Sequence, residues 1–220
     1  MRPAFIYAPP QTPWLRVVYQ DDTIVVFDKP AGLLTVPGRA AEHQDSLWLR
    51  AVERWPSIKV IHRLDMATSG LVLMALGSTS QSHLSRQFAA RSVDKHYVAQ
   101  CYGQCPDSEG LISLAMRCDW NNRPRQVIDL YAGKPAQTKW TLLQQKETSF
   151  TVRLQPITGR SHQLRLHMLS LGTPIVGDEF YAHPRAKHFA KRMHLHAAGL
   201  TILHPGNHES ISFESSASFV

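Results

Sequence analysis

The order of strand-like and helical runs is the feature that most limits how this chain can fold. Short runs rich in β-branched and aromatic residues recur along its 220 residues, whereas runs with helical spacing are few and do not alternate with them. A doubly wound parallel sheet needs a helix between successive strands, so this order argues against one. We therefore predict an α+β fold, with a mixed, mostly antiparallel sheet flanked by helices.

Eight segments have the composition of strands, and the first two suggest a hairpin. They are residues 15–19, 23–28, 70–76, 96–102, 137–143, 150–154, 195–203 and 210–213. Three helices are predicted: one capped by Ser46 and running to about Trp55, a second over 78–91, and a third over 161–171. Gly172 suits the position just after the last turn of the third helix.

The composition of the chain indicates its domain organisation, the kind of partner it binds and the cellular compartment in which it works. Residues 1–14 contain four prolines and are predicted to form an extended arm, with one domain over 15–220. Basic residues exceed acidic ones by 24 − 17 = 7, which favours a polyanion partner because each cation placed on a phosphate releases counterions. Three cysteines without paired CxxC spacing, no signal-like start and no membrane-length apolar stretch predict a soluble cytoplasmic protein with no membrane contact.

A carboxylate lies where a loop leads into the predicted strand 70–76. Asp65 follows Arg63 by two residues and precedes the hydroxyls of Thr68 and Ser69. A carboxylate that a nearby cation keeps ionised suits nucleophilic attack on a sugar or on an electron-poor ring. Spacing alone favours a different interpretation, in which Arg63 and Asp65 form a buried ion pair that fixes the turn.

Two further clusters contain side chains that can serve such a carboxylate or its substrate. A Gly-containing turn opens the predicted helix 161–171, so Arg160 and the amides there can meet phosphates, and Arg165 shares a helix face with His162. The alternative for this helix is a solvated basic face. Tyr97 faces either a cleft, where it can stack on a base and help transfer a proton, or the protein core.

The twelve histidines raise the question of a metal site. His162 and His167 are five residues apart on the predicted helix, which is a poor spacing for two ligands, and no HExxH motif is present. The P-loop, GxGxxG and GxSxG motifs are also missing from the sequence. We therefore expect neither a metal nor an organic cofactor.

Taken in order along the chain, these motifs resemble the signature of the RluA-type pseudouridine synthases. The segments that carry the resemblance are KPAGL at 29–33, HRLD and TSG within 62–70, KHYVA at 95–99, GRSHQLRLH at 159–167 and GD at 177–178. The resemblance extends from about residue 15 to beyond residue 197, which is nearly the whole chain.

The resemblance implies a pseudouridine synthase catalytic domain with a central RNA-binding cleft, without the S4-type domain that larger relatives carry. The reaction would isomerise uridine in RNA without a cofactor. Asp65 would be the nucleophile, Arg165 its ion-pair partner, and Tyr97 would pack against the target base. Leu195 aligns with an apolar active-site residue, although its neighbour His194 departs from the family's usually apolar residue.

The substrates implied by the resemblance are stem-loops of large-subunit (23S) ribosomal RNA and the tRNA anticodon stem-loop, recognised mainly by shape. The target uridine would flip out of its stem, and Arg63 would occupy the vacated space. Arg160 and His162 would help to bind the RNA, and we expect a monomer. Other candidates for phosphate contacts are Arg39, Arg123 and Arg125.

Two other classes of function compete with this hypothesis. A non-catalytic RNA-binding protein would need only the basic charge, and the combination of Asp65, Tyr97 and Arg165 argues against it. A glycoside hydrolase usually needs two cooperating carboxylates, and only one candidate carboxylate lies in a motif here.

Overall fold

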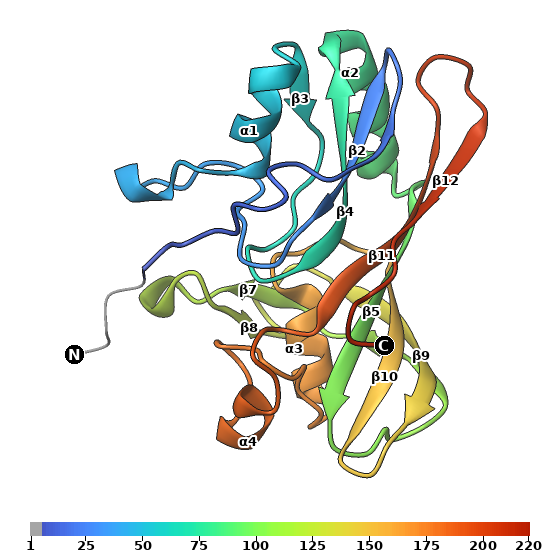
Figure 1. Cartoon of the computed structure of the whole chain (residues 1–220). Coiled ribbons are helices and arrows are strands. Elements are labelled where there is room, and N and C mark those ends of the chain that lie inside the picture. Colours follow the sequence, from blue (N-terminus) through green and yellow to red (C-terminus); the bar gives the residue numbers. More distant parts are fainter. Residues whose placement is uncertain (1–5) are drawn as a thin grey trace. The chain divides into compact units, whose positions relative to one another are not determined.

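The computed structural model describes residues 6–220, and these divide into two compact units (Figure 1). The first unit consists of the chain up to Val93 together with Thr201–Ser215, and the second of Asp94–Leu200 together with Ser216–Val220. The predicted arm over 1–14 is described from residue 6 onward, so its first five residues lie outside the described chain.

The antiparallel sheet of the first unit contains β1 (Val17–Gln20), β2 (Ile24–Lys29), β3 (Ile58–Val60) and β4 (Ser69–Leu76). β1 and β2 form the predicted hairpin. All residues of β4 except the last are buried, which explains why its sequence is apolar without alternation.

Two helices pack on this sheet. α1 (Leu47–Arg54) contacts β3, and α2 (Gly77–Ala90) contacts β3 and β4 (Figure 1). α1 begins where the sequence predicts, because the Ser46 hydroxyl accepts a hydrogen bond of 3.3 Å from the amide of Leu49. Both helices match their predicted extents to within one residue.

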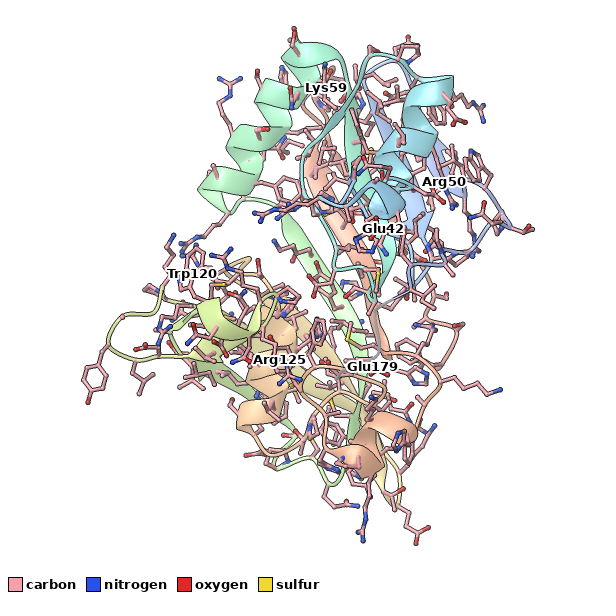
Figure 2. The ribbon with its side chains drawn as sticks, turned by 90° about the vertical axis from the view of Figure 1, so that its left-hand side faces the viewer. Glu42, Arg50, Lys59, Trp120, Arg125 and Glu179 are labelled. Atoms are coloured by element: carbon pink, nitrogen blue, oxygen red, sulfur yellow. The ribbon has the colours of Figure 1, made fainter. Side chains whose placement is uncertain are left out.

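The described part of the arm packs beside α1. The buried guanidinium of Arg50, which Figure 2 labels on this helix, lies 4.0 Å from the ring centroid of Trp14 and donates to its carbonyl (3.1 Å). The Trp14 indole N–H donates to Glu53 (3.3 Å), and the Tyr7 hydroxyl donates to the carbonyl of Asp45 (2.8 Å). These contacts hold the arm along the first unit.

The first unit is completed by the far end of the chain. β12 (Ser210–Glu214) forms a hairpin with β11 (Leu195–Leu203), and α2 is joined to the last residue of β11 by two hydrogen bonds of Gln87 (2.7 and 2.9 Å). His204, in the hairpin turn, contacts a carboxylate oxygen of Asp21 at 2.7 Å. Short 3-10 helix η1 (Ala41–His43) lies in the same unit.

The second unit is built on a sheet in which β11 up to Leu200 is followed in space by four more strands. Their order is β5 (Asp94–Tyr102), β10 (Ser149–Pro156), β9 (Gln137–Gln145) and β6 (Glu109–Ser113). The pairs β5–β10, β10–β9 and β9–β6 are all antiparallel. α3 (Gln163–Ser170) and the short α4 (Pro184–His188) belong to the same unit.

A separate two-stranded sheet projects from the second unit. It pairs β7 (Met116–Cys118) with β8 (Gln126–Ile128), and the 3-10 helix η2 (Trp120–Asn122) forms its tip. Met116 packs with Ala136 and with Leu166 of α3, so the base of this hairpin is anchored in the core of the unit.

The α+β class and the mostly antiparallel sheet are confirmed, and each predicted strand and helix is present with its ends displaced by at most two residues. The sequence analysis missed β3, β6, β7, β8 and α4, which are only three to five residues long. Within residues 6–220, no helix is both long enough and apolar enough to cross a bilayer.

Candidate active site

Asp65 lies in the loop between β3 and β4, and its side chain is half-buried. The loop is closed by a hydrogen bond from the Thr68 amide to the Asp65 carbonyl (3.1 Å). On the other side of Asp65, the Thr35 hydroxyl donates to the Leu64 carbonyl (2.8 Å) and accepts from the Leu64 amide (3.1 Å). The backbone on both sides of the carboxylate is therefore fixed.

The buried side chain of Lys29 forms hydrogen bonds to the loop that contains Asp65. The amino group of Lys29, the last residue of β2, donates to the carbonyls of Pro30 (2.9 Å), Leu33 (2.8 Å) and Met66 (3.2 Å), and its side chain is fully buried. Burial lowers the pKa of Lys29 to about 7, and the nearby carboxylates of Asp65 and Asp28 partly oppose that shift. Lys29 therefore interacts electrostatically with Asp65, and the sequence analysis did not assign it a role.

The hypothesis of an Arg63–Asp65 ion pair is wrong. Arg63 is exposed and forms no hydrogen bond or ion pair with any residue of the described chain. Its neighbour His62 is turned into the unit, where its Nε2 accepts from the amide of Leu73 (3.0 Å) and its ring stacks on Phe88 at 4.8 Å. Arg63 therefore points to solvent from the loop segment that precedes Asp65.

Arg165 occupies a buried position on α3 and is 3% exposed. Its Nε and Nη2 donate to the two carboxylate oxygens of Asp178 at 2.7 and 2.6 Å, a bidentate geometry that fixes the plane of the guanidinium. The rings of Phe180 and Tyr181 lie 5.1 and 5.0 Å from the guanidinium carbon. A cation held on three sides keeps one orientation.

The alternative of a solvated basic face for this helix is wrong, because every residue from Gln163 to Met168 is buried. The helix also begins at Gln163 rather than at residue 161. His162 has a left-handed backbone conformation (φ 57°), which a helical residue does not adopt. Gln163 instead caps the turn, since its side-chain oxygen accepts from the Thr158 hydroxyl (2.7 Å) and from the Arg160 amide (3.0 Å).

His162 and Arg160 lie at the start of α3. The His162 Nδ1 is 2.7 Å from the hydroxyl of Tyr181, which also accepts a hydrogen bond from the amide of Gln126 on β8 (2.8 Å). The Arg160 side chain donates from Nε to the carbonyl of Pro135 at 3.2 Å. The position of Tyr181 between the hairpin and the helix was not foreseen.

Tyr97 is half-buried on β5, opposite Leu154 of β10. It shares a strand face with Lys95, which is half-buried, and with Ala99, which is fully buried, because side chains two apart point to the same side. Burial lowers the pKa of Lys95. The face that carries Tyr97 therefore passes from partly exposed to core along the strand.

Leu195 is the first residue of β11 and is 3% exposed. Its neighbour His194 is half-buried, with Nδ1 2.8 Å from the side-chain oxygen of Gln100 and its ring stacked on Phe219 at 4.4 Å. Burial, followed by the charge of Arg192, lowers the pKa of His194 to about 4, so the imidazole is neutral at neutral pH. A neutral stacked ring keeps this strand end largely apolar.

The candidate residues come from both units. Asp65 and Arg63 belong to the first, whereas Tyr97, Arg165, Leu195, Arg160 and His162 belong to the second. Asp178 was present in a quoted motif, but nothing in its spacing showed that it would bind Arg165. Within residues 6–220, no group of three or more His, Cys, Asp or Glu side chains is arranged to hold a metal ion.

Comparison with known proteins identifies the class to which this fold and these residues belong. The family model of the RNA pseudouridylate synthases matches residues 23–170, and the chain belongs to that family. It is therefore an isomerase, and the catalytic hypothesis is favoured over non-catalytic RNA binding.

Individual relatives narrow the class. The chain is 50% identical over 214 residues to the dual-specificity RNA pseudouridine synthase RluA of Escherichia coli (strain K12), covering 97% of this chain and 98% of that protein. It is also 50% identical over 202 residues to the protein of the same name from Vibrio cholerae, covering 92% of this chain and 82% of the relative.

Solved structures agree with this assignment. Human RNA pseudouridylate synthase domain containing 1 superimposes with a TM-score of 0.78 at 28% identity, covering 100% of this chain and 88% of that one. Human RNA pseudouridylate synthase domain containing 4 has a TM-score of 0.73 at 23% identity over 92% of this chain and 88% of that one, which supports the fold alone.

Proposed function

We propose that this enzyme isomerises uridines in two kinds of RNA, stem-loops of 23S ribosomal RNA and the tRNA anticodon stem-loop. The observation that carries the proposal is 50% identity, over 97% of the chain, to a relative named as a dual-specificity RNA pseudouridine synthase. Residues 15–220 act as one catalytic domain, and the enzyme works as a monomer in the cytoplasm. Its excess of seven positive charges suits an RNA substrate.

Asp65 is the nucleophile of the proposed mechanism. It attacks either the ribose C1′ or the base, the C1′–N1 bond breaks, and the base turns so that C5 bonds to C1′. The bond between Asp65 and its adduct is cleaved, which restores the carboxylate. The proton of C5 is lost and N1 gains one, so the product is an isomer of the substrate. The fixed backbone on both sides of Asp65 supports this role, because a positioned nucleophile avoids the entropy of finding its target.

Arg165 and Tyr97 assist Asp65 in this proposal. Arg165 pairs with the Asp65 carboxylate and keeps it ionised, and the rigid hold of Asp178 on the guanidinium supports that role. Tyr97 packs against the target base and helps to move a proton during the rearrangement. Leu195 provides an apolar contact in the same site.

The RNA must present its uridine outside the stem before Asp65 can reach it. Arg63 is proposed to occupy the space that the uridine leaves, and its solvent-exposed side chain without a partner in the described chain is consistent with this role. Arg160 and His162, at the start of α3, bind the backbone of the RNA.

The test is to incubate the protein with an anticodon stem-loop RNA and to map pseudouridine by carbodiimide-blocked primer extension. Wild type should give a stop at one loop uridine, and Asp65→Ala should give none while binding the RNA as tightly as wild type. Equal activity in Asp65→Ala would refute the proposed nucleophile. Activity on a 23S stem-loop but not on the anticodon stem-loop would refute the second substrate alone.

A further inference from the structure

The tip of the β7–β8 hairpin displays an aromatic ring to solvent. Trp120 lies in η2, where Figure 2 labels it, and is 66% exposed. Its indole N–H donates to no atom of the described chain. The guanidinium carbon of Arg123 lies 3.7 Å from the centroid of the ring, so one face of the indole is stacked and the other edge and face remain accessible. An indole held in this way presents a flat π surface to a ligand.

The ring is held on an ordered tip. The Asp119 amide donates to the Arg125 carbonyl (3.0 Å), and the Arg125 amide donates back to the Asn122 carbonyl (3.0 Å). The Asn122 side chain donates to the Asp119 carboxylate (2.9 Å), and its amide donates to the Asp119 carbonyl (3.2 Å). Because the tip is already closed by hydrogen bonds, a ligand that meets Trp120 does not have to order it first.

The charges around the ring favour an anionic partner. The two nearby carboxylates are engaged within the hairpin region, Asp119 by Asn122 and Asp129 by Arg117 (2.6 Å). Arg123 and Arg125 form no ion pair with any residue in the described part of the chain. The guanidinium of Arg125, labelled in Figure 2, lies 5.9 Å from the ring centroid of Phe180. Two cations without carboxylate partners thus accompany the exposed ring.

We propose that Trp120 and Arg123 form a stacking platform for an unpaired nucleobase of the substrate RNA, separate from the uridine that is isomerised. An exposed aromatic ring recognises any base through its π face, and a stacked guanidinium extends that surface while it meets the phosphate backbone. Arg125 contacts the adjoining phosphate. The proposal rests on the proposed function for the identity of the RNA, and it adds a binding site to it.

Removal of the platform should weaken RNA binding without slowing the isomerisation of bound RNA. RNA binding is measured by fluorescence anisotropy with a labelled anticodon stem-loop that carries an unpaired single-stranded extension, and single-turnover isomerisation is measured on the same RNA. Trp120→Ala should raise the Kd by roughly 5- to 150-fold, whereas the rate at saturating enzyme should stay within about twofold of wild type. Trp120→Phe, which keeps a ring, should recover most of the affinity.

The control is Leu111→Ala on β6, which removes another exposed apolar side chain of the same unit (55% exposed) and should leave the Kd unchanged. The melting temperature of Trp120→Ala should match that of wild type, since the Trp120 side chain is 66% exposed. Unchanged affinity in Trp120→Ala would overturn the platform, and so would an equal loss in Leu111→Ala. A loss of saturating rate at unchanged Kd would overturn it as well.

Binding is measured independently of turnover, so the platform and the proposed function can fail separately. If no pseudouridine forms but Trp120→Ala still weakens RNA binding, the platform stands and the reaction fails. If isomerisation occurs and Trp120→Ala binds RNA normally, the reaction stands and the platform fails, and an exposed Trp120 would then be a surface for a protein partner.

Discussion

The buried amino group of Lys29 binds a backbone carbonyl of the loop that contains Asp65, and its charge interacts with the Asp65 carboxylate. Its three hydrogen bonds to carbonyls are made in a position fully removed from water, and burial lowers its pKa to about 7 from an ordinary value of 10.5. The unfolded chain keeps this proton up to a pH near 10.5, whereas the folded protein releases it above about 7. The free energy of unfolding therefore rises with pH across that window.

The first prediction at this scale concerns that window. In Lys29→Met the pH-dependent contribution disappears, so wild type should gain about 2 kcal/mol of unfolding free energy relative to the variant between pH 7 and pH 9. Urea denaturation at the two pH values measures the difference. The control is Lys59→Met, which removes an exposed lysine of β3 that Figure 2 labels. If wild type gains the same unfolding free energy relative to Lys59→Met between the two pH values, Lys29 is not the cause.

Asp178 is the residue on which the orientation of Arg165 depends. Replacing it by asparagine removes the carboxylate that the buried guanidinium binds in a bidentate geometry, and breaking a buried ion pair costs about 3–5 kcal/mol. Asp178→Asn should lower the free energy of unfolding by about that amount. Arg117→Gln breaks the exposed pair with Asp129 and should cost less than about 1 kcal/mol. Equal costs in chemical denaturation would contradict the structural role assigned to Asp178.

Sequence reasoning named the residues that carry chemistry more readily than the residues that support them. Asp65, Tyr97 and Arg165 lie in dense local motifs, so the resemblance brought all three forward, and their roles remain predictions. Lys29 and Asp178 act on groups distant along the chain, and a motif does not state which carbonyls or which cation a side chain will meet. The Arg63–Asp65 pair failed for the same reason, since closeness in sequence did not bring the two charges together.

At the scale of elements, Tyr181 connects the β7–β8 hairpin to the start of α3. Its hydroxyl accepts from the Gln126 amide and contacts His162 Nδ1, while its ring lies against Arg165. Tyr181→Phe keeps the ring and removes both hydrogen bonds, which we expect to cost about 1–3 kcal/mol of unfolding free energy because the groups are left unsatisfied.

Hydrogen exchange measures the local consequence of that change. The Gln126 amide should exchange faster in Tyr181→Phe, whereas the amide of Leu142, which donates to the Ser108 carbonyl elsewhere in the unit, should be unaffected. Uniform acceleration of both amides would mean global destabilisation and would contradict a specific link between hairpin and helix.

Element length explains which parts of the fold were predictable. β11 was predicted with its observed ends because nine residues of strand composition leave little choice of period. β7 and β8 have three residues each and were missed, since such short strands carry no period and depend on anchoring by Met116 against α3. α3 was predicted two residues too early because His162 has a left-handed backbone conformation, which the sequence pattern does not reveal.

At the scale of the whole molecule, the α+β class followed from the order of strands and helices, whereas the division into two units did not. A split of this kind is decided by which segments pack together, and the sequence shows no linker where the chain passes from Leu200 to Thr201. The crossing lies inside the continuous strand β11, so local composition gives no sign of it.

That crossing has a consequence for how the protein is made on the ribosome. The first unit needs residues 201–215, including the turn in which His204 meets Asp21 and the strand end that Gln87 binds. Residues 6–93 leave the ribosome more than one hundred residues earlier and must wait for those partners. The unit that begins translation first can therefore reach its native state only after the second unit has been synthesised.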